Sequence, residues 1–349
     1  MTTTADTKQV YIRVGHRYLK SIGSHGILGG RSFELPVDVA WDSQGRLYVA
    51  NRSDAVPRIT VIDFDDEYYL EFGSPIDRER PEGVITWPGG IAVDSSDTIY
   101  VSDQKTHRIN LYDREGNLLD KWGATGSAEG ELKEPSGLVF DADDNLYVSD
   151  TGNNRIQMFN KRGEFLQSWG TKGSDEGQLS MPWGIALDDE NNVYVADWGN
   201  DRVQKFTSQG EFLLSVGSTG DGNGQLKHPS GVAVDRGGDI YVADWANDRL
   251  QVFDPKGTYQ VQFTGDATLS KWGLEIILGS PDFARERHRA TLEPERRFWR
   301  PNSVKVDSQD RIFVLDTSRH RMQIYQKETV LVDADWIDLD NPKRELQIR

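Results

Sequence analysis

The chain repeats a thirteen-residue stretch almost unchanged, because YVADWGNDRVQKF at 194–206 returns as YVADWANDRLQVF at 241–253. The repeat belongs to a longer unit that starts at a proline, and six such prolines occur: Pro36, Pro88, Pro135, Pro182, Pro229 and Pro301. The third unit reads PSGLVFD, NLYVSD, NRIQMFN and GEFLQSWG, which are short apolar and aromatic runs separated by Asp, Asn and Gly turns. Each unit therefore predicts four antiparallel strands. Because one such sheet cannot bury both of its faces alone, six units packed radially predict an all-β, six-bladed β-propeller.

The two ends of the chain are predicted to share one blade. The sixth unit contains PNSVKVD, RIFVLD and HRMQIYQ but no convincing fourth strand, whereas GHRYLKSIG at 15–23 aligns with RGEFLQSWG at 162–170. We expect the N-terminal strand to complete the last blade, which leaves few free strand edges. This predicts a disordered N-terminus at 1–8, a single propeller domain at 9–327 with an insertion at 264–299 between blades five and six, and a C-terminal tail at 328–349 packed on the propeller.

The repeat pattern is similar to that of a known family. PSGLVFDADDNLYVSDTGNNRIQMFNKRGEF resembles an NHL repeat, and the units spread over residues 15–327 resemble a six-bladed NHL propeller. The resemblance implies the fold more firmly than the function, because propellers of this type serve as enzymes, RNA binders and protein scaffolds.

Composition narrows the classes of partner. The formal net charge is −16, which disfavours a broad nucleic-acid-binding face because it repels phosphate backbones. There is no cysteine, so disulfides and thiolate sites are excluded. The start, MTTTADTKQ, lacks the pattern of a signal peptide and no long apolar run occurs, so we expect a cytoplasmic protein with no membrane partner.

The metal-dependent enzyme classes on related propellers do not match at their key positions. The resemblance to NHL-type amidating lyases would require histidine directly after the blade prolines, and none of the six positions has one. Gluconolactonase-like hydrolases place several carboxylates and amides around the channel, whereas here only Asn302 fits. We therefore expect no metal and no cofactor, and no catalytic residue can be named, although a lyase or hydrolase without the usual metal ring remains the alternative function.

One charged pair recurs in most units and is predicted to be structural. An aspartate ends the second strand and an arginine opens the third in five units: Asp103 and Arg108, Asp150 and Arg155, Asp197 and Arg202, Asp244 and Arg249, Asp316 and Arg321. A carboxylate facing a guanidinium across a tight loop stabilises the turn. His107 and His320, just before two of these arginines, are also predicted to be structural.

Other positions differ between the units and are the candidates for function. The residue after the strand-two aspartate is Arg52, Gln104, Thr151, Trp198, Trp245 or Thr317, so the repeat itself does not require tryptophan there. These residues lie on what we define as the top face, the side with the loops between second and third strands and the loops that join blades. Exposed indoles often mark contact surfaces, although each could also simply cover its own loop. At the channel mouth, Trp183 and Asn302 follow blade prolines, and Trp183 either plugs the channel or forms the floor of a pocket.

The insertion at 264–299 is the longest segment outside the repeat. SPDFARERHRATLEP predicts a short helix with Ser280 as N-cap and Pro294 ending it. KWGLEIILG, which includes Trp272, is apolar and is expected to be buried. Six arginines between 281 and 300, among them Arg285 and Arg289, make a basic island that is expected to cover the top-face tryptophans. The alternative is a solvated helix paired with acidic loops.

These observations predict a binding or scaffold propeller rather than an enzyme. Its top face would present an aromatic pocket with an arginine-rich lid to a protein, a peptide or a small-molecule ligand. The candidate ligand-binding residues are Trp183, Trp198, Trp245, Trp272, Arg52, Gln104, Asn302, Arg285 and Arg289.

Overall fold

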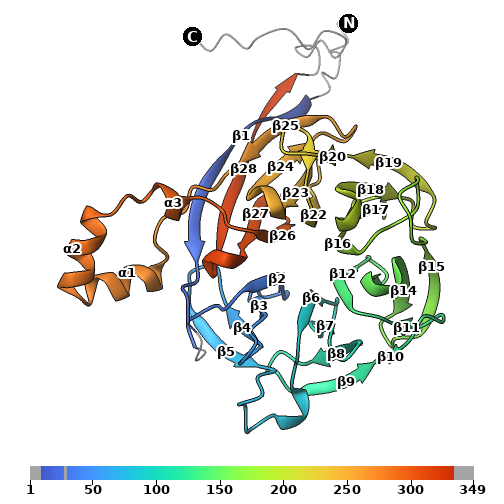
Figure 1. The fold of residues 1–349 in the computed structure, drawn as a ribbon, viewed down its shortest axis with the longest axis horizontal. Helices are drawn as coiled ribbons and strands as arrows, with labels where there is room; N and C mark the ends of the chain where they lie inside the picture. The colour runs from blue at the N-terminus through green and yellow to red at the C-terminus, as the bar shows by residue number, and fades with distance from the viewer. Residues whose placement is uncertain (1–8, 27–29, 334–349) are drawn as a thin grey trace, which may run out of the picture.

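Six four-stranded antiparallel sheets surround a central channel (Figure 1). The structure is a computed structural model that describes residues 9–26 and 30–333. Blades one to three contain β2 (Pro36–Trp41), β3 (Leu47–Asn51), β4 (Arg58–Ile62) and β5 (Tyr68–Phe72); β6 (Pro88–Val93), β7 (Ile99–Asp103), β8 (Arg108–Tyr112) and β9 (Leu118–Trp122); and β12 (Pro135–Phe140), β13 (Asn145–Asp150), β14 (Arg155–Asn160) and β15 (Phe165–Trp169). Blades four and five contain β16 (Pro182–Leu187), β17 (Val193–Asp197), β18 (Arg202–Phe206) and β19 (Phe212–Val216); and β22 (Pro229–Val234), β23 (Ile240–Asp244), β24 (Arg249–Phe253) and β25 (Tyr259–Phe263).

The sixth blade is built from both ends of the chain. Its strands are β26 (Pro301–Val306), β27 (Arg311–Asp316), β28 (Arg321–Asp333) and β1 (Gln9–Ile22), in the order β1-β28-β27-β26. The antiparallel register runs from Ile22 opposite Met322 to Gln9 opposite Asp333. The predicted closure by the N-terminal strand is confirmed. Strand β28 continues six residues past the predicted domain end at 327. The prediction of a disordered N-terminus at 1–8, and that of a packed tail over 334–349, concern residues outside the described ranges.

The core lies between neighbouring blades. In the first three strands of a blade most residues are buried, whereas the outer strand alternates, as in β19, because only one of its faces meets the next blade. Trp122 and Trp169 end their outer strands against the following blade: Trp122 lies 4.8 Å from Phe159 and Trp169 lies 6.4 Å from Phe206, measured between ring centroids. Both indoles therefore pack between blades. Two short parallel pairs, β10 (Ala124–Thr125) with β11 (Glu131–Leu132) and β20 (Ser218–Thr219) with β21 (Gln225–Leu226), order loops between blades.

A polar link joins five of the six blades to the next blade through two residues with left-handed backbones. In five blades the last residue of the loop after strand two has positive φ, and its side chain accepts a hydrogen bond from the residue before the next blade's proline. Asn154, for example, accepts from the Met181 amide at 3.0 Å. Asn, Asp and His tolerate this backbone conformation and can accept such a bond. The acceptors are His107, Asn154, Asp201, Asp248 and His320. His107 and His320 are therefore structural, as predicted.

Two histidines at the closure predict an acid-sensitive fold. Burial and the neighbouring Arg13 and Lys327 lower the pKa of His16 in β1 to about 4, and burial and His25 lower the pKa of His320 to about 4. A pKa lowered on folding means that the unfolded chain binds more protons, so this stability is present above about pH 6.5 and is lost as the pH falls toward about 4. Because both rings are partly exposed, we expect a loss of about 1 kcal/mol from each.

Urea unfolding at about pH 7.5 and about pH 5 measures this effect. His320→Asn is the matched variant, since Asn154 makes the equivalent bond in blade three. We expect it to retain stability at neutral pH and to show less loss at pH 5. Equal pH dependence in the two proteins would show that His320 does not carry the effect.

The insertion lies beside the propeller and does not cover its top face. It contains α1 (Lys271–Leu278), α2 (Pro281–Arg289) and α3 (Glu293–Arg296), and it stands outside blade six, next to β1 (Figure 1). Trp272 anchors it: its Nε1 donates to the Asp66 carbonyl at 3.0 Å, and its ring joins the apolar cluster of Phe33 and Val39. The predicted lid over the tryptophans is therefore wrong, because the anchor of the insertion lies at the outer junction of blades six and one.

The local prediction for the insertion is correct only in part. Ser280 caps α2 as expected, but α2 ends at Arg289 and Pro294 lies inside α3. The segment KWGLEIILG forms α1, in which only Trp272 is buried. The expectation that this whole apolar stretch is buried is wrong. No helix in the described part of the chain is long and apolar enough to cross a membrane.

Candidate functional site

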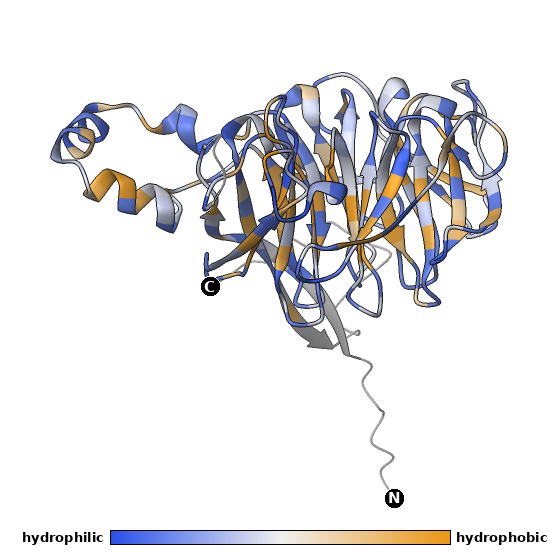
Figure 2. Ribbon diagram, turned by 90° about the horizontal axis from the view of Figure 1, so that it is seen from below, coloured by the Kyte–Doolittle hydropathy of each residue, from blue (hydrophilic) through white to orange (hydrophobic). Residues whose placement is uncertain are grey.

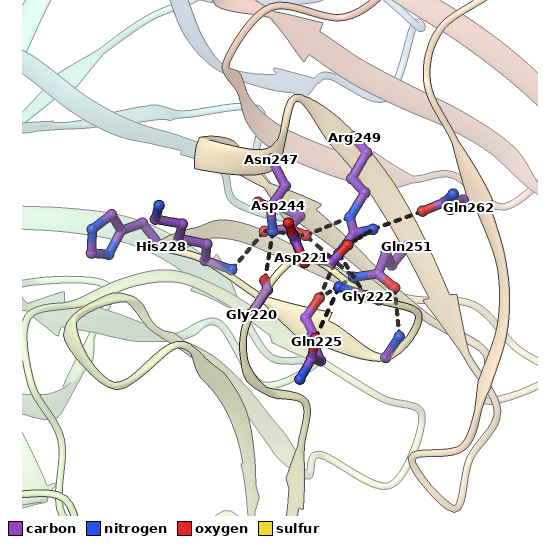
Figure 3. Close-up of polar contacts among 12 residues, drawn as sticks. Gly220, Asp221, Gly222, Gln225, His228, Asp244, Asn247, Arg249, Gln251 and Gln262 are labelled. Atoms are coloured by element: carbon purple, nitrogen blue, oxygen red, sulfur yellow. Dashed lines mark hydrogen bonds and ion pairs between the residues drawn. The ribbon is translucent and has the colours of Figure 1, made fainter.

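The Asp–Arg pairs are buried supports of the top-face loops. In blade five, Asp244 accepts from Arg249 Nε at 2.7 Å, from Asn247 and from the Lys227 amide, and it is fully buried (Figure 3). Arg249 also donates to the carbonyls of Asp221, Gly222 and Gln225, which ties the loop between blades to this pair. Equivalent pairs form in blades three, four and six. Their side chains are saturated within the fold, so they are structural.

Blade two departs from this arrangement. Arg108 is exposed and forms no ion pair with Asp103 in the described structure, so the prediction of a fifth pair is wrong. Asp103 instead accepts from four backbone amides, those of Thr86, Trp87, Lys105 and Thr106. The aspartate is needed to satisfy loop amides, whereas the arginine is not.

The position after the strand-two aspartate contacts the next blade. Thr151 donates to the Pro182 carbonyl at 2.7 Å, and Thr317 donates to the Pro36 carbonyl at 2.6 Å. Arg52 donates to the Pro88 carbonyl through Nε and Nη2. Gln104 is 8% exposed, and its side chain packs beside Gly89. In blades one, three and six, the side chain at this position therefore donates to the carbonyl of the next blade's proline. Threonine is large enough to make this hydrogen bond.

Trp198 and Trp245 make a different contact at the same position. Trp198 stacks on His228, with 4.0 Å between ring centroids and 13° between the planes. The Arg300 guanidinium lies over Trp245 at 4.9 Å from the ring centroid. His228 and Arg300 both precede the proline of the next blade, and both indoles remain partly exposed. On the top face, Trp198 thus stacks on an imidazole, and Trp245 forms a cation–π contact with a guanidinium.

The channel mouth is closed by residues from opposite blades. Trp183 and Asn302 both line the channel, and the cavity around them measures about 20 Å³, space for roughly one water molecule. The Arg52 guanidinium lies 5.6 Å from the Trp183 ring centroid and 5.4 Å from that of Trp87. Asn302 is 8% exposed and donates to the Val37 carbonyl, so it bonds blade six to blade one. Trp183 therefore plugs a narrow channel, with Arg52 across its mouth.

Arg52 is a partly buried cation of this group, whereas Arg300 is exposed. Burial lowers the pKa of Arg52 to about 10, which leaves it charged at neutral pH. It forms no ion pair within the described residues, and two of its nitrogens share the Pro88 carbonyl. A carboxylate from outside would fit such a guanidinium well, because a planar guanidinium binds a carboxylate through two parallel hydrogen bonds.

The structure brings part of the predicted site together and separates the rest. Trp183 and Arg52 meet at the channel mouth, and Trp198 and Trp245 lie on top-face loops of adjacent blades. Trp272, Arg285 and Arg289 belong to the insertion outside blade six, so they are not part of this surface (Figure 1). Sequence reasoning missed the stacking partners Trp87, His228 and Arg300. The signal that could have found them is the variation of the residue directly before each blade proline.

We name this surface the stacking face: Arg52, Trp87, Trp183, Trp198, His228, Trp245 and Arg300. It combines four indoles with the imidazole of His228 and the guanidiniums of Arg52 and Arg300. Within the described residues, no group of three or more His, Asp or Glu side chains is arranged to hold a metal ion. The arrangement therefore offers surfaces for stacking and for anion binding rather than a metal centre.

Comparison with protein families agrees with the blade pattern. Residues 86–109, 132–159, 179–206, 226–253 and 298–325 match the family model described as NHL repeat. These five matches fall on blades two to six. Blade one, where Asn51 replaces the aspartate, lies outside them. The chain is thus an NHL-repeat protein folded as a six-bladed β-propeller.

Individual relatives add information on the fold. The chain is 29% identical over 110 residues to Protein brain tumor of Drosophila melanogaster, a match that covers 31% of this chain and about a tenth of that protein. Its structure is similar to that of a protein of unknown function from Bacteroides thetaiotaomicron, with a TM-score of 0.59, 19% identity and coverage of 92% of this chain and 77% of the other. It is also similar to streptogramin B lyase, with a TM-score of 0.54, 11% identity and coverage of 92% and 98%. At these identities the structural similarities concern the fold alone.

Proposed function

We propose that this propeller is a binding module whose stacking face holds an acidic peptide segment of a partner protein that carries aromatic or prolyl side chains. The observation that carries the proposal is Arg52, a partly buried guanidinium between Trp87 and Trp183 that has no carboxylate partner in the described structure. A carboxylate of the peptide would supply that partner. Because the surroundings of Arg52 are poorly hydrated, the resulting ion pair would be stronger than one in open solvent.

The two added stacks extend the same surface across blades four to six. Trp198 on His228 and Trp245 on Arg300 keep their indoles partly exposed, and the stacking contact holds each indole in one orientation. Rigid aromatic rings bind a peptide at low entropic cost and often dominate interface energies. Aromatic-lined grooves also suit prolyl and aromatic side chains. A peptide that enters at Arg52 would therefore find further contacts toward blade five.

Replacing Trp198 and Trp245 together by threonine is expected to weaken peptide binding by about 2 kcal/mol or more, which is roughly thirtyfold in Kd. The fold should be retained, because Thr151 and Thr317 occupy the same position in blades three and six and bond the next blade. The measurement is the affinity, by isothermal titration calorimetry, of a peptide enriched on the unaltered protein from a random displayed library.

A matched control is Tyr69→Thr, which removes an aromatic side chain of 49% exposure from the outer strand β5. The control should bind the peptide as the unaltered protein does. If the double tryptophan variant also keeps full affinity while its melting temperature is unchanged, the stacking face is not the binding surface.

A further inference from the structure

Helix α1 is mostly apolar, with Lys271 and Glu275 as its charged residues, but only Trp272 is buried. Trp272 is 3% exposed, whereas Leu274, Ile276 and Leu278 are 46%, 54% and 71% exposed. Phe283 at the start of α2 is 52% exposed beside them. Figure 2 shows α1 as an apolar helix that stands clear of the propeller. Large apolar side chains that are exposed together are typical of an interface, so we treat this helical hairpin (residues 271–289) as a candidate contact surface.

The insertion also carries a small excess of positive charge on an acidic protein. Residues 281–297 contain five arginines and four acidic residues, whereas the whole chain has a net charge of −16. Arg285, Arg287 and Arg297 pair with acids of the insertion itself. Arg289 and Arg296 are exposed and form no ion pair within the described part of the chain. A segment that is both apolar and acidic would complement this surface.

The chain itself contains such a segment. From the last residue of β28, the sequence reads DADWIDLD (Asp333 to Asp340), with four aspartates and the apolar residues Trp336, Ile337 and Leu339. The apolar residues would cover the exposed side chains of α1, and the aspartates would face Arg289 and Arg296. We call residues 333–340 the acidic tail segment.

The reach of the acidic tail segment favours the hairpin of another copy over that of the same chain. The insertion is anchored by Trp272 on Asp66, and Asp66 also pairs with Lys20, which lies opposite Ile324 in the β1–β28 register. Asp333 lies nine residues farther along β28, which is about 30 Å at ~3.3 Å per residue. Trp336 to Leu339 follow Asp333 by only three to six residues, a reach of about 10–20 Å. In Figure 1 the end of β28 lies at the upper edge of the molecule, whereas the helices lie at its left side.

We propose that the helical hairpin binds the acidic tail segment of a second copy of this chain. Two copies can exchange these segments reciprocally, which gives a closed dimer with the same contact made twice. The stacking faces of both copies stay outside this contact, because the hairpin stands at the outer wall of blade six. The dimer is therefore independent of the peptide binding proposed above.

The test measures the molar mass of the full chain by light scattering across a concentration series. We expect a dimer, and a monomer after truncation behind Asp333. We also expect a fluorescent peptide of residues 333–349 to bind the truncated chain. Leu274→Glu with Leu278→Glu should weaken both the dimer and the peptide complex by about tenfold or more, because both changes place a charge in the apolar contact.

The control pair is Leu119→Glu with Leu213→Glu, two leucines of 57% and 48% exposure on the outer strands β9 and β19. These variants should dimerise as the unaltered chain does. A full chain that stays monomeric at about 100 μM, a concentration far above the Kd of a specific dimer, would overturn the proposal. A dimer that survives truncation, or peptide binding that is unaffected by the hairpin variants, would overturn it as well.

Discussion

Deletion of residues 1–24 is expected to lower the free energy of unfolding by more than about 4 kcal/mol and to cause aggregation. The deletion removes β1, which pairs with β28 along its length and contributes Ile22 to the core. It also removes the ion pair between Lys20 and Asp66 that connects blade six to blade one. Strand β28 would then present an open edge, a template for pairing with other chains. Chemical denaturation and light scattering measure the two effects.

Deletion of residues 1–7 is the control, because these residues precede β1. It should change the unfolding free energy by no more than about 0.5 kcal/mol. If the 1–24 deletion unfolds at the same denaturant concentration as the full chain, the strand pairing at the closure does not stabilise the ring.

Replacing Asp150 by alanine is expected to cost about 3 kcal/mol of stability. The fully buried carboxylate of Asp150 accepts from the Lys133 amide, Asn153, Arg155 and Gln157. Without it, Arg155 would be a poorly solvated cation and the loop amide would lose its acceptor. Peptide affinity, measured well below the melting temperature, should not change.

Blade two provides the matched comparison for the arginine. Arg155→Ala should be clearly destabilising, because Arg155 bonds Asp150 and the carbonyls of Ser127, Ala128 and Glu131. Arg108→Ala at the equivalent position should cost no more than about 0.5 kcal/mol, because Arg108 is exposed. An Asp150→Ala variant with full stability and no peptide binding would instead make this aspartate part of the binding site.

The repeat made most of the fold predictable. A strand pattern that recurs from one proline to the next defines the blades, and the missing fourth strand of the last unit predicts its replacement by residues 15–23. The insertion was predicted less well, because periodicity gives no information about a segment that occurs once. Its position depends mainly on Trp272 at the Asp66 carbonyl, a tertiary contact that no local pattern announces.

The candidate site was predictable only where one blade differs from the others at a fixed position. This comparison found Arg52, Trp183, Trp198 and Trp245. It missed Trp87, His228 and Arg300, which lie at another variable position, directly before the blade prolines. Arg285 and Arg289 were assigned to the top face on charge alone, and charge does not determine where a loop folds.

Parallel selection from one random displayed peptide library, on the unaltered protein and on a variant with Arg52, Trp198 and Trp245 all replaced by threonine, tests the central claim most directly. Threonine is the residue of blades three and six at this position, so the variant should keep the propeller fold. We predict that the unaltered protein enriches acidic peptides with aromatic or prolyl residues and that the variant does not. Enrichment of the same peptides on both proteins would contradict the claim that the stacking face is the binding surface.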